Sequence, residues 1–364
     1  QSSVSITDNI TVTFSEAMDT TYVTTNTSDT YCSGTIKVSS DNFSTCVKMS
    51  SSPASSNSNK TFTLDPYDNL TVLTTYLVRV TTGVKDTAGN AMSSQYENSS
   101  PVTTKNLWGV TYGNGLFVTV GLNGTILTSS DGTSWDNRTS GTSKKLNGGT
   151  YANSTFVTVG GSGTILTSTD GTSWDNRTSG TTKNLWEVTY GNSTFVAVGI
   201  SGTIITSSDG TSWDNKTSGT SKNFKGLTFG NSTFVTVGQS GYILTSSDGT
   251  TWDNRTSGTS NFLYGVTYGN STFVAVGDSG NILTSSDGTS WDNRTSGTSN
   301  LLNGVTYGNS TFVAVGDSGN ILTSSDGTSW DNRTSGTSND LYGVTYENST
   351  YVATGENGTI LTSS

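Results

Sequence analysis

From residue 107 to residue 364, the sequence repeats one unit of 39 residues in tandem, and this repeat restricts the fold more than any other feature. An Asp-Gly pair marks the period, and a Trp follows four positions after each Asp. A period of about 40 residues that contains several short β-strands is typical of propeller blades. We therefore predict that residues 105–364 form a seven-bladed β-propeller.

Each unit predicts four strands. Leu-x-Gly-Val-Thr-Tyr is the first strand, Phe-Val-x-Val-Gly the second and Ile-Leu-Thr-Ser-Ser the third, with Gly-Asn-Ser-Thr as the turn after the first. Asp-Gly predicts a two-residue hairpin that needs positive φ. The fourth strand carries the Trp, whose apolar face seals one blade against the next. These structural positions are Asp131, Trp135, Asp170, Trp174, Asp209, Trp213, Asp248, Trp252, Asp287, Trp291, Asp326 and Trp330.

The pattern Ser-x-Asp-Gly-x-x-Trp resembles the Asp-box turn of sialidase-like propellers, with one residue fewer between Asp and Trp. The resemblance implies a folding motif on the side away from an active site. A calcium-binding or catalytic role for these aspartates is the alternative.

Residues 1–104 lack the repeat and predict a β-sandwich, because short alternating runs at 10–14, 35–38, 61–64 and 76–80 are separated by turn residues. Residues 10–19 resemble the opening of the bacterial Ig-like domain of S-layer and other surface proteins. Residues 82–90 resemble the closing segment of that domain, with 102–104 as its last strand. The resemblance implies an extracellular spacer or assembly module. Only nine residues precede the first run, so the family's additional first strand is short or missing.

The seventh copy begins at Leu341 and stops before its own Asp-Gly pair, which leaves a sheet edge that needs a partner. In the repeat register, residues 95–100 are one candidate for the closing strand. The Ig-like domain requires the same stretch, so residues 95–106 close either the propeller or the Ig-like domain, or serve both in succession.

Two cysteines, Cys32 and Cys46, are the only ones in the chain. They predict a local disulfide and an oxidising compartment; two free buried thiols are the alternative. The net charge of −10 opposes binding to nucleic acid, which needs Lys and Arg against phosphates. No apolar run is long enough to span a membrane. The start at Gln1 fits a mature secreted or cell-surface form after signal-peptide removal, with trimming as the alternative.

The chain has no His, the most frequent general base and metal ligand. We expect no catalytic residues, no metal and no cofactor. Sialidase-type catalysis needs three converging arginines, whereas those of the repeats recur at one equivalent position around the ring. Paired carboxylates for glycoside hydrolysis are the remaining catalytic option, since Asp278, Asp317 and Glu356 are equivalent in three successive units.

Differences between the copies predict a contact face. Because strands alternate in direction, the loop before the first strand and the loop between the second and third lie on one face. These loops vary, whereas the turns on the other face barely vary. The variable positions give a predicted contact set that consists of Trp108, Trp186, Lys225, Tyr264, Tyr342, Asp278, Asp317 and Glu356. Aromatic residues there are candidate anchors; drift at exposed positions is the alternative. Glu187 replaces the Gly of the other copies and is a candidate residue of the central axis, with sporadic replacement as the alternative.

Three functions follow from these observations. The first is a non-enzymatic structural subunit of a cell-surface filament or array that self-assembles by strand sharing. The second is an adhesin that binds carbohydrate or protein through the variable face, and the third is a glycan-processing enzyme. Asn-x-Ser/Thr sequons repeat along the chain and predict glycosylation, or turns built on Asn; examples are Asn137, Asn153, Asn176 and Asn192.

Overall fold

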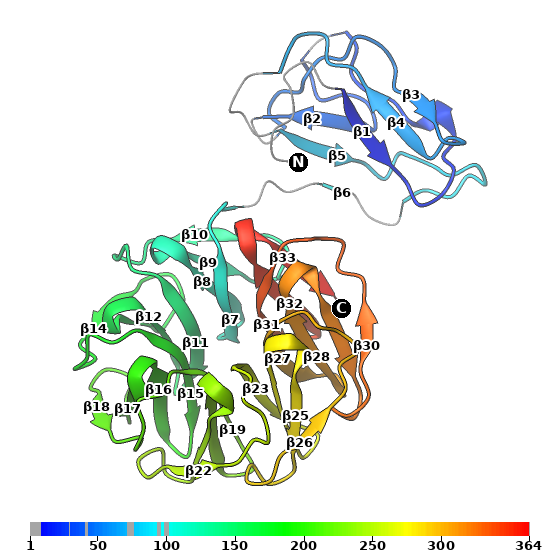
Figure 1. Cartoon of the computed structure of the whole chain (residues 1–364). Helices are drawn as coiled ribbons and strands as arrows, with labels where there is room; N and C mark the ends of the chain where they lie inside the picture. Colours follow the sequence, from blue (N-terminus) through cyan, green and yellow to red (C-terminus); the bar gives the residue numbers. More distant parts are fainter. Residues whose placement is uncertain are drawn as a thin grey trace. The chain divides into compact units, whose positions relative to one another are not determined.

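The computed structural model describes residues 9–28, 30–40, 43–70, 76–92, 96–97 and 102–363. The chain divides into two compact units, Gln1–Ser100 and Pro101–Ser364 (Figure 1). Each unit is all-β, and each is described by itself below.

The first unit contains two three-stranded sheets. One sheet has the order β1-β4-β3 and the other β2-β5-β6. Four of these strands coincide with the predicted runs, whereas β3 is a run of small, exposed residues without an apolar alternation. A short 3-10 turn, η1 (Thr20–Tyr22), follows β1. The strands are β1 (Ile10–Thr13), β2 (Ile36–Ser39), β3 (Ala54–Ser56), β4 (Thr61–Leu64), β5 (Leu77–Val80) and β6 (Tyr96–Glu97).

The core of this unit lies between the two sheets. Phe62 and Leu64 of β4 are buried on one side, and Ile36 and Val38 of β2 are buried on the other. The apolar residues of these strands alternate with more exposed ones, which is the pattern of a sheet with one buried face. This arrangement confirms the predicted sandwich.

The segment at residues 95–106, for which two roles are predicted, divides between the two units. β6 pairs antiparallel with β5, with Tyr96 opposite Val80, so the described residues 96–97 belong to the Ig-like sheet. Residues 95 and 98–100 lie outside the described residues. Residues 102–104 form no strand, which differs from the prediction. Thr103 instead lies against Gly358 at the far end of the chain.

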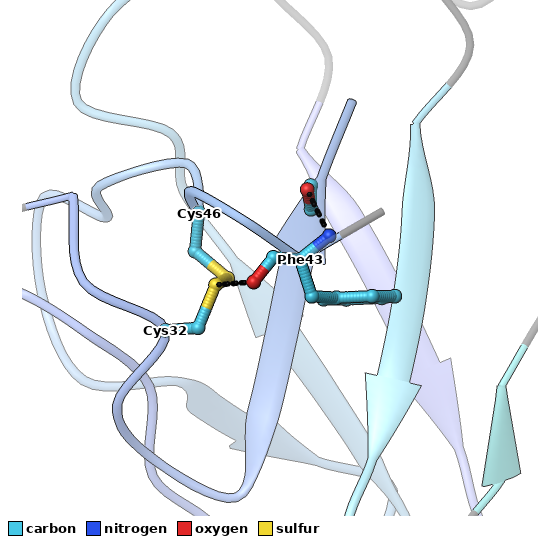
Figure 2. The surroundings of a disulfide bond; sticks show 4 residues. Cys32, Phe43 and Cys46 are labelled. Carbon is cyan, nitrogen blue, oxygen red and sulfur yellow. Dashed lines mark hydrogen bonds between the residues drawn. A yellow bond between two sulfur atoms is a disulfide. The ribbon is translucent and has the colours of Figure 1, made fainter. Parts of the chain in front are cut away.

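The predicted disulfide is present and joins Cys32 to Cys46, which are 14 residues apart (Figure 2). It closes the loop around Phe43, whose backbone oxygen lies 3.3 Å from Cys32 Sγ. Phe43 has a φ of 64°, and its N–H donates to Ser39 Oγ at 2.9 Å. The Arg79 guanidinium covers the Phe43 ring at 3.8 Å, so the loop is attached to β5 as well.

Replacing both cysteines with serine is expected to lower the free energy of unfolding of the first unit by about 3 kcal/mol, because the disulfide restricts the unfolded chain over a loop of this size. Urea denaturation of the variant and the parent, with probes for each unit, measures the change. The propeller transition is the internal control and should not move. A loss below about 0.5 kcal/mol would contradict the expectation.

The second unit is a ring of antiparallel sheets, each built from consecutive strands (Figure 1). Its described residues form six four-stranded sheets and one three-stranded sheet. The innermost strands are β7 (Leu107–Gly113), β11 (Leu146–Ala152), β15 (Leu185–Gly191), β19 (Phe224–Gly230), β23 (Leu263–Gly269), β27 (Leu302–Gly308) and β31 (Leu341–Glu347). The second strands are β8 (Leu116–Gly121), β12 (Thr155–Gly160), β16 (Thr194–Gly199), β20 (Thr233–Gly238), β24 (Thr272–Gly277), β28 (Thr311–Gly316) and β32 (Thr350–Gly355).

The outer strands are shorter. The third strands are β9 (Ile126–Ser129), β13 (Ile165–Ser168), β17 (Ile204–Ser207), β21 (Ile243–Ser246), β25 (Ile282–Ser285), β29 (Ile321–Ser324) and β33 (Ile360–Ser363). The fourth strands are β10 (Asp136–Arg138), β14 (Asp175–Arg177), β18 (Asp214–Lys216), β22 (Asp253–Arg255), β26 (Asp292–Arg294) and β30 (Asp331–Arg333). Between the second and third strands lie the 3-10 turns η2 (Leu122–Gly124), η3 (Gly161–Gly163), η4 (Ile200–Gly202), η5 (Gln239–Gly241), η6 (Asp278–Gly280), η7 (Asp317–Gly319) and η8 (Glu356–Gly358).

The tight hairpin of each unit is not the predicted Asp-Gly pair. Ala152 pairs directly with Thr155, so Asn153 and Ser154 form a two-residue hairpin with φ values of 49° and 57°. Positive φ at both central residues is the requirement of a type I′ turn, and Asn tolerates it. At Asp170-Gly171 only the Gly has positive φ.

The Asp-Gly pair begins a longer turn that the Asp side chain stabilises. In the second copy, Asp170 Oδ1 accepts the N–H groups of Thr172 and Ser173 at 2.8 and 2.9 Å. These N–H bonds hold the pKa of Asp170 well below its usual range. Trp174 Nε1 donates to Gly171 O at 3.1 Å. The fourth strand begins only at Asp175, so the Trp lies in the turn before this strand and not within the strand as predicted. The same bonds recur from Asp131 to Asp326.

Adjacent sheets share apolar clusters, and the Trp residues take part in them. Trp213 is buried with Phe195 of its own sheet and with Val157 and Val159 of the preceding sheet. The ring closes because β31 lies beside β7 in the same manner. Asn357 N also donates to Asn106 Oδ1 at 3.2 Å, although 251 positions separate the two residues. The last sheet is therefore closed by packing and by residues 103–106, without a fourth strand among the described residues.

The helical turns of the described residues are all of the 3-10 type and three residues long. In the part of the chain that the structure describes, no helix has the length and apolar character needed to cross a membrane.

Candidate functional site

The second residue of each innermost strand lies at one mouth of the central channel. In every sheet the register shifts between the first and third residues of this strand; for example, Leu185 pairs with Gly199 and Glu187 with Val198. The intervening residue, Trp186, has no partner across the ladder, so a bulge frees it to point away from the sheet. A hollow of about 130 Å³ results, and it is lined by Trp108, Asn147, Trp186, Glu187, Lys225, Tyr264, Asn303 and Tyr342.

Aromatic rings and ammonium groups alternate around part of this hollow. Tyr342 stacks on Trp108 with ring centroids 4.1 Å apart. Lys145 Nζ lies 3.5 Å from the Trp108 centroid and 4.5 Å from that of Trp186. Lys225 Nζ lies 2.9 Å from the centroid of the same Trp186 ring. The hollow therefore has flat π faces and two cations within one small space.

Both lysines are half-buried at a place that disfavours their charge. Burial lowers the pKa of Lys145 to about 8. Burial and the nearby charge of Lys145 together lower the pKa of Lys225 to about 7. No salt bridge among the described residues includes either lysine. Below about pH 7 both side chains are mostly charged, and neither has a carboxylate partner among the described residues.

Several polar atoms of the hollow residues also lack a partner. The indole N–H groups of Trp108 and Trp186 are buried and make no hydrogen bond with described residues. Asn147 donates from Nδ2 to Leu185 O at 2.6 Å, whereas its Oδ1 atom is buried and unpartnered. Buried polar groups are normally hydrogen-bonded, so unpaired ones indicate a site for water or ligand.

The three predicted acids begin the turns η6, η7 and η8 and do not line the hollow. Asp317 Oδ1 accepts from Asn303 Nδ2 at 3.0 Å, which joins the acid to a residue of the hollow. Burial and the carboxylate of Asp278 raise the pKa of Tyr264 to about 12. Burial, Asp340 and Glu356 likewise raise the pKa of Tyr342 to about 12. Both tyrosines are therefore neutral hydrogen-bond donors at neutral pH, as an ordinary tyrosine is.

Glu187 lies deeper, where the inner strands surround the channel. It also lines a second hollow, of about 110 Å³, whose wall consists mainly of backbone and valine from the inner strands. Its Oε1 atom accepts the Val188 N–H at 3.0 Å. Glu187 is half-buried and part of its surface faces the channel, and burial raises the pKa of Glu187 to about 8. The side chain is therefore mostly protonated at neutral pH.

The substitution Glu187→Gln is expected to stabilise the propeller at pH 7.5 and to have little effect at pH 4. Above pH 4.5 the carboxyl ionises in the unfolded chain but stays protonated in the folded chain up to about pH 8. Parent stability therefore falls across this window, and the amide, which does not titrate, avoids the loss. After a discount for channel water, we expect a gain of about 2 kcal/mol at pH 7.5. Denaturation at both pH values measures it, and an equal effect at both would contradict the expectation.

The structure brings together five members of the predicted contact set, namely Trp108, Trp186, Lys225, Tyr264 and Tyr342. It adds Asn147 and Asn303, which occupy the same variable repeat position as Trp108, and Lys145, which sequence reasoning did not select. Lys145 stands where other copies have Asn, Phe, Leu or Asp, and this variation was the available signal. Asn137, Asn153, Asn176 and Asn192 are all exposed, and their glycosylation stays a prediction.

Among the described residues, no three His, Cys, Asp or Glu side chains are grouped so that they could hold a metal ion. The repeat arginines pair with acids of their own outer strand, as Arg177 does with Asp175 at 3.0 Å. These pairs are exposed and contribute little to stability. The chemistry that the hollow offers is therefore stacking, cation binding to π faces and charge-assisted hydrogen bonding.

Comparison with known proteins supports both halves of the fold. Residues 1–104 match the family model of the bacterial Ig-like domain, which confirms the resemblance seen in the sequence. No curated protein matches the chain.

Solved structures similar to the chain are β-propellers. YCF48 from Cyanidioschyzon merolae has a TM-score of 0.60 at 17% identity, covering 72% of this chain and 96% of its own. A structure of YCF48 bound to D1 peptide has a TM-score of 0.60 at 18% identity, covering 73% and 95%. The WD40 β-propeller domain of Doa1 has a TM-score of 0.59 at 14% identity, covering 71% and 93%. At these identities the likeness shows the fold alone.

Proposed function

We propose that this protein is a non-enzymatic extracellular recognition protein that binds a ligand in the hollow at the mouth of the propeller channel. The observation that carries the proposal is the convergence of Trp108, Trp186, Tyr264 and Tyr342 with two lysines on one hollow. Aromatic residues in a concave site with a few polar groups are the usual composition of a ligand pocket.

The rest of the chain supports the same proposal. A bulge in each innermost strand presents one variable residue at the mouth, so the fold stays constant while the ligand-contacting residues differ between copies. The bacterial Ig-like domain and the disulfide fit a protein that acts outside the cell. YCF48, a propeller of similar fold, has been solved with the D1 peptide bound to it.

Changing Trp186 to Ala is expected to weaken ligand capture by about 30-fold, because a central aromatic anchor commonly contributes about 2 kcal/mol to binding. Tyr264→Ala should weaken capture as well. Binding of the labelled full chain to glycan and peptide arrays measures the effect. Tyr67→Ala is the matched control, since Tyr67 is an exposed aromatic residue of the first unit. Ligands retained equally by all three variants would place recognition outside the hollow.

Self-assembly into a surface filament is the second candidate, and the free strand edges favour it. Among the described residues, β33 pairs only with β32, and β1 pairs only with β4. Such edges can accept a strand from another subunit. Light scattering and negative-stain imaging of the purified chain test this candidate. Long head-to-tail oligomers would support it, whereas a monomer at high concentration would leave recognition by the hollow as the function.

A further inference from the structure

We propose that the ligand of this hollow is an anionic sugar residue, whose ring stacks on the aromatic wall and whose carboxylate is bound by Lys145 and Lys225. This inference rests on the proposed function and names the class of ligand.

The lysines require an anion. Lys145 and Lys225 both approach the ring of Trp186, so their ammonium groups share one region of the hollow. The titratable groups around them are Glu187 on β15, Tyr264 on β23 and Tyr342 on β31. Glu187 bonds to the Val188 N–H, and the two tyrosines are neutral hydrogen donors. Half-buried cations are seldom left unpaired in proteins, and a bound anion would supply the missing partner.

The walls suit a sugar ring. The hollow of about 130 Å³ is small beside ligand pockets of about 300–1,000 Å³, so it limits the bound part of a ligand to a single ring. Tyr342 stacks on Trp108, and the ammonium groups of Lys145 and Lys225 lie on the rings of Trp108 and Trp186. A sugar ring stacks on these aromatic rings as the ammonium groups turn toward its carboxylate. Asn147 Oδ1 and the indole N–H groups lack partners, and Asn303 also lines the hollow. Hydroxyl groups both donate and accept hydrogen bonds, so the hydroxyls of one sugar ring can bond to the Asn147 oxygen and to the indole N–H groups.

The charges around the mouth set the orientation of such a ligand. Lys144, Lys145, Lys183, Lys222 and Lys225 occur in successive early copies of the repeat, whereas Asp278, Asp317, Asp340 and Glu356 occur in the later copies. A carboxylate is attracted toward the first group and repelled by the second. The hydroxyl groups on the other side of the ring then face Tyr264 and Asn303. We therefore expect recognition of the acid group to depend on the lysines alone.

The test compares methyl β-glucuronide with methyl β-glucoside, which differ only at C6, a carboxylate in the first and a hydroxymethyl group in the second, by NMR titration of the full chain at pH 6.5. We expect the glucuronide to bind at least 10-fold more tightly, as a charge-assisted hydrogen bond commonly provides. The double variant Lys145→Met/Lys225→Met keeps the apolar stems and should abolish the preference while glucoside binding remains. Lys183→Met, which removes an exposed lysine of the same face, is the matched control and should keep the preference.

The pH adds a second readout. Raising the pH from 6.5 to 9 should weaken glucuronide binding, because both lysines lose their protons in this window, and should leave glucoside binding unchanged. Equal binding of both sugars, with loss of both in Trp186→Ala, would overturn the anionic-sugar proposal and keep the proposed function. A preference that survives in the lysine double variant would also overturn it. Binding of a peptide with a free carboxylate, dependent on Trp186 and both lysines and without glucuronide binding, would assign the hollow to peptides instead.

Discussion

Replacing Phe195 with alanine is expected to lower the free energy of unfolding of the propeller by about 4 kcal/mol, the usual loss for a large aromatic side chain removed from a packed core. Phe195 is fully buried in β16. Its ring lies 4.6 Å from that of Tyr190 and 6.4 Å from that of Trp213, centroid to centroid. It also stands beneath the turn glycine Gly210. The alanine variant thus opens a cavity where one blade meets its neighbour.

Guanidinium denaturation of the purified variant measures this effect. Phe195→Leu is the graded control and should lose about 1.5 kcal/mol, since leucine refills most of the space. The equivalent residues of the other copies are Phe117, Phe156, Phe234, Phe273, Phe312 and Tyr351, so the same change can be repeated around the ring. A loss below about 1 kcal/mol at Phe195 would show that this position is not part of the core that joins the blades.

Gly202→Ala is expected to destabilise the propeller by about 4 kcal/mol for two reasons that act together. Gly202 has a φ of 71°, a conformation that a residue with a Cβ adopts at a loss of about 1.5 kcal/mol. A Cβ at this position would also overlap the backbone oxygen of Thr220. The Gly202 N–H donates to Lys222 O at 2.7 Å, in the segment that leads to the next sheet. Moving the two backbones apart to make room for a Cβ would break this hydrogen bond. Overpacking against backbone adds about 2.5 kcal/mol.

Gly219→Ala is the matched control. Gly219 has a nearly identical φ of 73°, but no atom lies within 4 Å of the position of its Cβ. This variant should therefore show only the conformational part, about 1.5 kcal/mol. Thermal and denaturant unfolding of both variants measure the difference. Equal losses in the two variants would show that backbone conformation, and not the approach of the neighbouring blade, is what selects glycine at Gly202.

The fold was largely predictable because the repeat supplies the same information several times. The period predicts the blades, and the β-branched and aromatic runs predict three of the four strands of each blade. The assignment of the hairpin was wrong, since both Asn-Ser and Asp-Gly are frequent turn pairs and composition does not rank them. In the structure, Asn153 and Ser154 take the positive φ values, while Asp170 binds the N–H groups that follow it.

The candidate site was predictable only as a set of variable positions. Comparison of the copies selects Trp108, Trp186 and Tyr264 because they differ while the strands around them do not. Asn147 and Asn303 occupy the same repeat position as these three residues. The comparison gives no reason to add Lys145 to the group or to place Asp278 outside the hollow. The meeting of these side chains at the hollow depends on a bulge in the first strand of each unit, and no residue pattern predicts this bulge.

The sequence by itself determined the β class, the two-part organisation, the period of the propeller and the disulfide, because each depends on local spacing and on residue type. Only the tertiary structure decided that β6 completes the Ig-like sheet and that residues 103–106 meet Gly358 and Asn357 at the closure of the ring. It also decided that two lysines and four aromatic side chains meet at one mouth. These contacts join residues far apart in the chain, and their positions follow from how the sheets pack around the axis.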